Sequence, residues 1–205
     1  MRIAAAWIAL VAAAVAVAGC TVQVPGTAVP DAASAPGPAA PSQSSAPAQA
    51  PPEGAFVDAL GRFALVPPAG WTVDTSGAQG TSVVFLDPLP STSIAGRFSA
   101  NINVIVVPSG AELEATVVGA RQELQGLTDY VQTSDESVTL TDGTPAHLLG
   151  GSFTDQATGL ALRNVQLFTV YEGATLVATG TSLQDVWGAY EQTLQTSLRS
   201  LTVVI

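Results

Sequence analysis

The chain of 205 residues contains no lysine, and it has a single cysteine and a single histidine. Without lysine there is no Schiff-base nucleophile and no Walker A phosphate-binding motif. One histidine, His147, excludes zinc sites built from several imidazoles. One cysteine, Cys20, excludes a disulfide within the chain. We therefore predict no metal, no cofactor and a function that is not enzymatic.

Basic side chains are scarce as well. Six arginines oppose sixteen carboxylates, which gives a net charge of −10. Such a surface repels the phosphates of nucleic acids, so we predict no nucleic-acid partner. It also repels anionic lipid headgroups, so we expect the globular part to stand off a bilayer rather than lie on it.

The N-terminal residues combine one positive charge, an apolar run and the cysteine. Arg2 precedes an apolar run over residues 3–18, and Val17, Ala18 and Gly19 stand directly before Cys20. The run is shorter than the ~20 residues that span a bilayer, and no basic cluster follows it. This pattern predicts a lipoprotein signal peptide over residues 1–19, cleaved before the cysteine.

Cys20 is then the predicted lipidation site. It would become the new N-terminus, carrying diacylglycerol on sulfur and an acyl chain on nitrogen. Two or three acyl chains anchor a protein stably where one does not. The predicted location is therefore the extracytoplasmic face of a bacterial cell membrane, with the membrane itself as a partner.

Residues 20–54 are a low-complexity segment of Pro, Ala, Ser and Gln with few large apolar side chains. Such a composition cannot bury enough apolar surface to offset the entropy of ordering. We expect a disordered linker that lifts the following domain away from the membrane, and whether it is glycosylated stays open.

Residues 55–205 predict one α+β domain, a single antiparallel sheet with helices on both sides. Apolar residues at steps of three and four predict the helices. The first follows Pro108, with Ser109 as N-cap and Glu112 as its capping-box partner, and the second begins at Ser182 with Asp185 as partner. The predicted stripes are Leu113, Val117, Ala120, Leu124 and Leu127, then Leu183, Trp187, Tyr190, Leu194, Leu198 and Leu201.

Runs of β-branched and aromatic residues bounded by Gly and Pro predict the strands. Asp142-Gly143 and Glu172-Gly173 are expected to be two-residue hairpin turns, and a longer loop is expected over residues 155–159. The strands are predicted at 62–66, 71–75, 81–86, 98–107, 137–140, 146–153, 162–171 and 175–181.

His147 is the candidate base for a hydrolase. Ser152 lies near it in sequence but on the opposite strand parity, so a Ser/His/Asp site would need a distant serine. We expect a surface or sheet-edge histidine. Asp135 and Glu136 are the candidate carboxylate pair of a glycosidase, but adjacent strand residues point to opposite faces, and their Thr/Ser neighbours indicate a solvated loop.

Three aromatic residues are weak candidates for a ligand pocket: Trp71, Trp187 and Tyr190. The helical spacing of the last two favours core positions instead. Arg97, after Gly96, could hold an anion in a loop, although a solvated arginine is the expected case.

Residues 63–71, FALVPPAGW, resemble the strand–Pro–Gly–Trp opening of PsbP-like domains. Ala178, followed by Trp187, Tyr190, Leu194 and Leu198, is similar to their closing strand and helix. With the lipidation motif over residues 17–20 and the linker, the chain resembles the LpqN/LpqT-type lipoproteins of mycobacteria and their relatives. The resemblance covers residues 55–205 and implies an antiparallel sheet between helices, an envelope location and no established catalytic residues.

The function expected from these observations is that of a non-catalytic, lipid-anchored envelope protein that binds an envelope lipid or a membrane-protein partner. One alternative is a hydrolase of cell-wall polymers that uses His147 with Asp135, Glu136 or a serine. Another is a structural module of the wall. The ligand, the partner and the oligomeric state stay open.

Overall fold

A computed structural model of the chain describes residues 50–204. The predicted signal peptide, Cys20 and all but the end of the linker lie outside the described residues. No helix in the part described is both long and apolar enough to cross a membrane.

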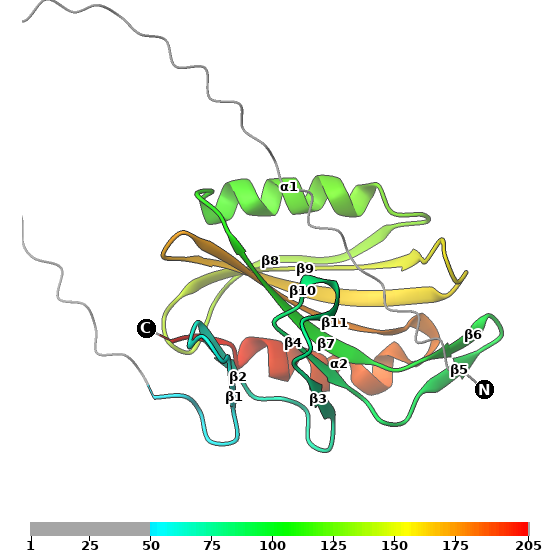
Figure 1. The fold of residues 1–205 in the computed structure, drawn as a ribbon. Helices are drawn as coiled ribbons and strands as arrows, with labels where there is room; N and C mark the ends of the chain where they lie inside the picture. The colour runs from blue at the N-terminus through cyan, green and yellow to red at the C-terminus, as the bar shows by residue number, and fades with distance from the viewer. Residues whose placement is uncertain (1–49, 205) are drawn as a thin grey trace, which may run out of the picture. The chain divides into compact units, whose positions relative to one another are not determined.

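The centre of the domain is an antiparallel sheet of seven strands (Figure 1). The chain runs from β7 through a helix to the far edge strand β8, then returns by hairpins through β9 and β10 to β11, which pairs with β7. The order across the sheet is β3 (Thr72–Asp74), β4 (Val83–Leu86), β7 (Asn101–Pro108), β11 (Ala174–Leu183), β10 (Ala161–Tyr171), β9 (Pro145–Thr154) and β8 (Val131–Thr139).

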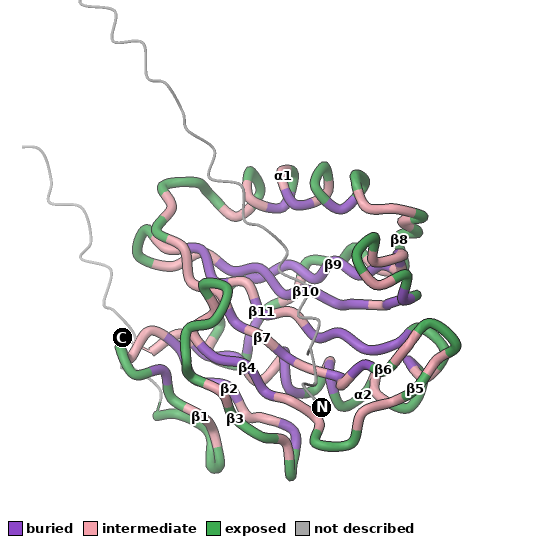
Figure 2. Tube along the Cα trace, turned by 45° about the vertical axis from the view of Figure 1, so that its right-hand side comes forward, coloured by how far each residue is buried: buried purple, intermediate pink, exposed green. Residues whose placement is uncertain are grey.

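Two helices cover opposite faces of this sheet. Helix α1 (Leu113–Gln125) packs on Leu149, whereas α2 (Trp187–Arg199) belongs to the main core with Leu148. Because adjacent residues of a strand point to opposite faces, these contacts place the helices on opposite sides, as predicted. Figure 2 shows the buried residues concentrated on the strands between the helices.

The prediction of a single sheet was wrong, because two small sheets accompany the large one. The segment between β2 and β3 contains Pro67, Pro68 and Gly70, the last with φ 80°. Proline has no backbone N–H to donate to a neighbouring strand, so the sheet is interrupted there. One small sheet consists of β1 (Phe56–Val57), β2 (Phe63–Leu65) and β12 (Thr202–Val203). The other is the hairpin of β5 (Ser91–Ser93) and β6 (Gly96–Phe98).

Both helices begin later than the capping patterns predicted. The N–H of Ser109 donates to the carbonyl of Gly173 at 2.7 Å, which keeps this residue with the sheet, and α1 starts only at Leu113. Ser182 lies in β11, where it is paired with Arg163 of β10, and it does not cap α2. Strand pairing therefore outweighed the local capping preference, and a short 3₁₀ turn, η2 (Gln184–Val186), precedes α2.

One hairpin turn was predicted correctly and one was not. Glu172 and Gly173 have φ values of 45° and 77° between the paired ends of β10 and β11, as the expected two-residue turn requires. At the β8–β9 connection the N–H of Leu140 donates to the carbonyl of Thr144, so residues 141–143 form a three-residue turn.

Hydroxyl side chains at the C-terminal end of α2 fix this end of the domain to its beginning. Ser197 Oγ donates to the Val66 carbonyl at 2.6 Å, and Ser200 Oγ accepts from the Val66 N–H at 2.8 Å. The N–H of Val203 donates to Asp142 at 2.8 Å. The strand after α2 is thereby tied to both β2 and the β8–β9 turn.

Candidate functional site

Polar side chains occupy the α1 face of the sheet where apolar ones are normal. They form two rows across the adjacent strands β10, β11 and β7, which we call the amide rows. The alternation along β10 places them on the same face as Phe168, which packs against α1. Strand pairing aligns Asn164, Thr181 and Asn101 in one row and Gln166, Thr179 and Asn103 in the other.

The inner ends of the amide rows are buried and lack partners. Gln166 is 1% exposed and Asn164 is 2% exposed. In the described part of the chain, neither end of the Gln166 amide has a hydrogen-bond partner, nor does Asn164 Oδ1. Buried polar atoms are normally paired, because leaving one unsatisfied costs about 1–3 kcal/mol. These atoms therefore mark a place where a polar partner is expected.

The outer ends of the rows reach the surface. Thr179, Asn103 and Asn101 are each half-buried. Exposure therefore increases along both rows from β10 toward β7. Amides donate and accept at once and carry no charge, so the rows suit an uncharged ligand with hydroxyl or amide groups.

A second cluster surrounds His147 beneath α1. Its Nε2 lies 2.7 Å from Asp135 Oδ1, and its Nδ1 lies 3.3 Å from Ser137 Oγ. Arg121 of α1 donates twice to the Asp135 carboxylate, at 2.8 and 2.9 Å. This guanidinium, helped by the histidine, lowers the pKa of Asp135 to about 2.

His147 was expected on the surface or at the sheet edge, and that prediction was wrong. The residue is 7% exposed, on β9, one strand inside the edge strand β8. The contacts run from Asp135 through His147 to Ser137, as they do from the acid through the base to the nucleophile of a catalytic triad. Both Asp135 oxygens, however, also accept from Arg121. An exposed serine on an edge strand, with the acid tied to a guanidinium, is more typical of a structural ion-pair network.

Asp135 and Glu136 point to opposite faces, as strand geometry predicts. Asp135 pairs with Arg121 on the α1 side, whereas Glu136 lies 3.4 Å from Arg199 of α2. The prediction that they lie in a solvated loop was wrong, because β8 begins at Val131 and contains both. They cannot act together across one substrate.

The aromatic candidates divide into two groups. Trp187 is 4% exposed and belongs to the main core, with the Arg163 guanidinium 4.8 Å from its ring centroid. Trp71 and Tyr190 form an edge contact at 6.4 Å and are half-buried. The Tyr190 hydroxyl donates to Asp87 at 2.7 Å, and burial raises the pKa of this tyrosine.

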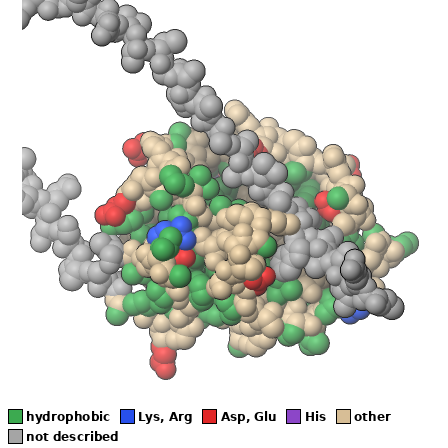
Figure 3. Space-filling view, in the orientation of Figure 1, with side chains coloured by type: hydrophobic (Ala, Val, Ile, Leu, Met, Phe, Trp, Pro, Cys, Tyr) green, Lys and Arg blue, Asp and Glu red, His purple; other side chains and the backbone are tan. Residues whose placement is uncertain are grey.

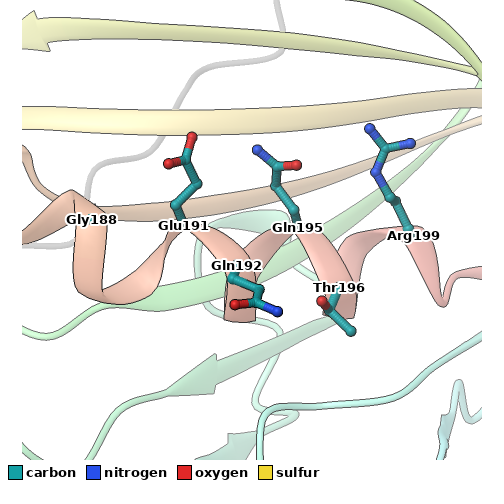
Figure 4. Close-up of a pocket in the computed structure, with 6 residues that line it drawn as sticks. All are labelled: Gly188, Glu191, Gln192, Gln195, Thr196 and Arg199. Atoms are coloured by element: carbon teal, nitrogen blue, oxygen red, sulfur yellow. The ribbon is translucent and has the colours of Figure 1, made fainter.

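A shallow polar hollow lies along α2, with a volume of about 500 Å³. Figure 4 shows Glu191, Gln195 and Arg199 directed toward the sheet and Gln192 and Thr196 directed away from it. Its charges are already paired, Glu191 with Arg163 and Arg199 with Glu136. The hollow is lined by amide side chains too. Unlike the amide rows, however, none of its lining residues has a buried polar atom without a hydrogen-bond partner.

Arg97 lies on β6 and is exposed. Within residues 50–204 no group of three His, Cys, Asp or Glu side chains could hold a metal ion.

Sequence reasoning missed the amide rows, although a signal was present. In β10 the apolar pattern is interrupted by Asn164 and Gln166 at every second position of an otherwise buried strand. Two amides on one face of a central strand are unusual, because such side chains are mostly exposed. The alignment with β11 and β7 could come only from the strand order.

The order of strands and the two covering helices define a PsbP-like α+β fold. No described protein family and no curated protein matches the sequence, so this conclusion rests on solved structures. The chain is similar to LpqN of Mycobacterium tuberculosis, a protein described as involved in cell envelope biogenesis, with TM-score 0.55 and 19% identity over 70% of this chain and 83% of that one. It is also similar to cyanobacterial PsbP (CyanoP) of Synechocystis sp. PCC 6803, with TM-score 0.50 and 19% identity over 73% of this chain and 91% of that one.

Proposed function

We propose that this chain is a lipid-anchored envelope protein whose domain binds, without catalysis, the uncharged headgroup of an envelope lipid at the amide rows. The observation that carries the proposal is the buried amide of Gln166, which has no hydrogen-bond partner at either end. A ligand hydroxyl or amide placed there would satisfy both ends, which makes binding favourable without new apolar contact.

The charge of the site selects the ligand class. No Arg, Lys or His belongs to the amide rows, and Arg163 projects from the other face of β10, where it pairs with Glu191. Phosphate and carboxylate groups are normally bound by arginine or lysine. With a net charge of −10 as well, the domain favours a neutral, hydroxyl-bearing headgroup over an anionic one.

The location rests on Cys20 and on the fold. A lipid anchor at Cys20 would tether the domain to the membrane from which an envelope lipid could be taken. The similar structure of LpqN, described as involved in cell envelope biogenesis, supports an envelope role. The anchor is tested by Cys20→Ser, which should move the protein from the membrane fraction to the soluble fraction and remove the mass of the acyl groups from the intact protein.

Binding is tested by the lipids that co-purify with the full lipoprotein. Wild type, Gln166→Met and the control Gln192→Met, an exposed glutamine of α2, are isolated in parallel and their extracts compared by mass spectrometry. We expect one lipid class with wild type and the control, and its loss with Gln166→Met. The same lipid in equal amount in all three would contradict the assignment of the site, and no lipid in any would favour a protein partner or a structural role.

A further inference from the structure

The hairpin formed by β5 and β6 has an unusual tip. Ser93 pairs with Gly96, which leaves Ile94 and Ala95 as the two turn residues. Turns of this length normally carry Asn, Asp or Gly, because these residues accept the required backbone angles and are solvated. Here an isoleucine occupies the turn with its side chain fully exposed, at 106% of the reference area.

A second large apolar residue lies on the same excursion of the chain. Leu89, two residues before β5, is 75% exposed. Figure 1 shows the hairpin projecting from the end of the domain, and in Figure 3 hydrophobic side chains stand out at this end, at the far right. Single exposed apolar residues need no explanation, but two on one projecting segment indicate a contact surface.

The charge of the hairpin differs from that of the remaining surface. Arg62, Arg121, Arg163 and Arg199 each pair with a carboxylate. Arg97, on β6, is the one arginine of residues 50–204 for which the structure shows no ion pair, and it is exposed. An acidic domain thus presents its free positive charge three residues from its most exposed apolar side chain. This pairing of an apolar tip with a cation matches the interface of an anionic bilayer.

The base of the hairpin connects to the proposed binding site. Phe98 of β6 packs with Leu162 and Leu183, which are paired across β10 and β11 directly beside the row that begins at Asn164. A hairpin seated in the headgroup layer would therefore hold the end of the sheet where the amide rows start close to the membrane.

We infer that the β5–β6 hairpin is a membrane-contact element, in which Ile94 enters the headgroup region of an anionic bilayer and Arg97 pairs with a lipid phosphate. The inference builds on the proposed function, because it explains how a headgroup reaches the amide rows. It also refines the expectation that the acidic domain stands off the membrane, since the contact is limited to one projecting end.

The test uses the full lipoprotein in vesicles, with an environment-sensitive fluorophore on Ile94→Cys. The matched control is Leu60→Cys, at a leucine 76% exposed in the β1–β2 turn. Vesicles contain phosphatidylcholine alone or mixed with phosphatidylglycerol. We expect the label at 94 to shift to the blue with the mixed vesicles while the label at 60 keeps its emission in water. Arg97→Gln should reduce the embedded fraction about fivefold, the loss expected for one cation at an anionic surface.

Three results would overturn the inference. Water-like emission at both positions would exclude membrane contact by the hairpin. A blue shift that Arg97→Gln leaves unchanged would remove the arginine from the contact. A blue shift in native membranes but not in the lipid vesicles would make the occupant a protein.

The number of labels tests the anchor separately. One label per chain agrees with an acylated Cys20, whereas two would contradict the anchor without contradicting the hairpin contact. In that case binding of the same vesicles by the labelled chain in a Cys20→Ser background decides the inference.

Discussion

Replacing Gln166 by methionine is expected to stabilise the domain and abolish ligand binding. The structure leaves both ends of this amide buried without a partner. An unsatisfied buried polar group costs about 1–3 kcal/mol, and methionine of similar shape carries no such group. Allowing for imperfect repacking, the free energy of unfolding should rise by about 1–2 kcal/mol, which corresponds to roughly 2–8 °C in Tm for a domain of this size.

The assay is urea and thermal unfolding followed by circular dichroism. Gln192→Met, at an exposed position of α2, is the control and should change the stability by less than about 0.5 kcal/mol. Adding the lipid that co-purifies with wild type should raise the Tm of wild type and leave that of Gln166→Met unchanged. A ligand stabilises the folded state only of a protein that binds it. Destabilisation of Gln166→Met by more than about 1 kcal/mol would refute the reasoning, since it would mean that the glutamine is already satisfied.

Three further predictions concern stability and chemistry. Asp135→Asn removes a carboxylate whose pKa the Arg121 guanidinium lowers to about 2. Because this value lies below the unfolded pKa near 4, the stabilisation by the carboxylate is present above pH 5 and is lost as the pH falls through 2. Solvent screens this exposed pair, so we expect wild type to be more stable than the variant by at most about 1 kcal/mol above pH 5, as measured by urea unfolding at a series of pH values. Gly180→Ala should lower the free energy of unfolding by about 1–3 kcal/mol in the same assay, because the new Cβ would lie 3.0 Å from the side chain of Leu194 in α2. Gly188→Ala has open space around the new Cβ and should raise the free energy of unfolding by about 1 kcal/mol, because alanine favours the helix more than glycine does. A fluorophosphonate probe should not label Ser137 in wild type, as read by intact mass; labelling that disappears in His147→Gln would instead establish the triad and the hydrolase alternative.

Much of the fold could be predicted from the chain because local patterns and the final structure agree there. The alternation in β9, β10 and β11 gave strand positions within a few residues, and the glycine with positive φ at 173 marks its turn. The helical stripes identified the buried residues Val117, Leu124, Leu194 and Leu198.

Several of the failures share one physical cause, which is pairing between strands remote in sequence. Ser109 and Ser182 have the chemistry of helix caps, but strand partners remote in sequence hold both in the sheet. Asp135 and Glu136 look like loop residues until β9 pairs with them. A lone histidine such as His147 gives no sign of its neighbours, because Asp135 and Arg121 reach it from another strand and from α1.

The candidate site was hidden for the same reason. Asn164 and Gln166 stand two residues apart on β10, but each becomes part of a row only because β11 lies between β10 and β7. Asn164 is aligned with Thr181 and Asn101, and Gln166 is aligned with Thr179 and Asn103. The N-terminus and the scarcity of catalytic residues therefore predict an envelope binding protein, and this stays a prediction, while the position of the candidate site depended on the strand order.

The central claim is that the amide rows bind one uncharged lipid headgroup, and native mass spectrometry of the full lipoprotein tests it most directly. The protein is incubated with a lipid extract of the parent envelope, as wild type and as Gln166→Met. The account predicts one discrete added mass per wild-type chain, displaced by excess of the same lipid and absent from Gln166→Met. Equal adducts on both proteins, or none on wild type, would contradict it.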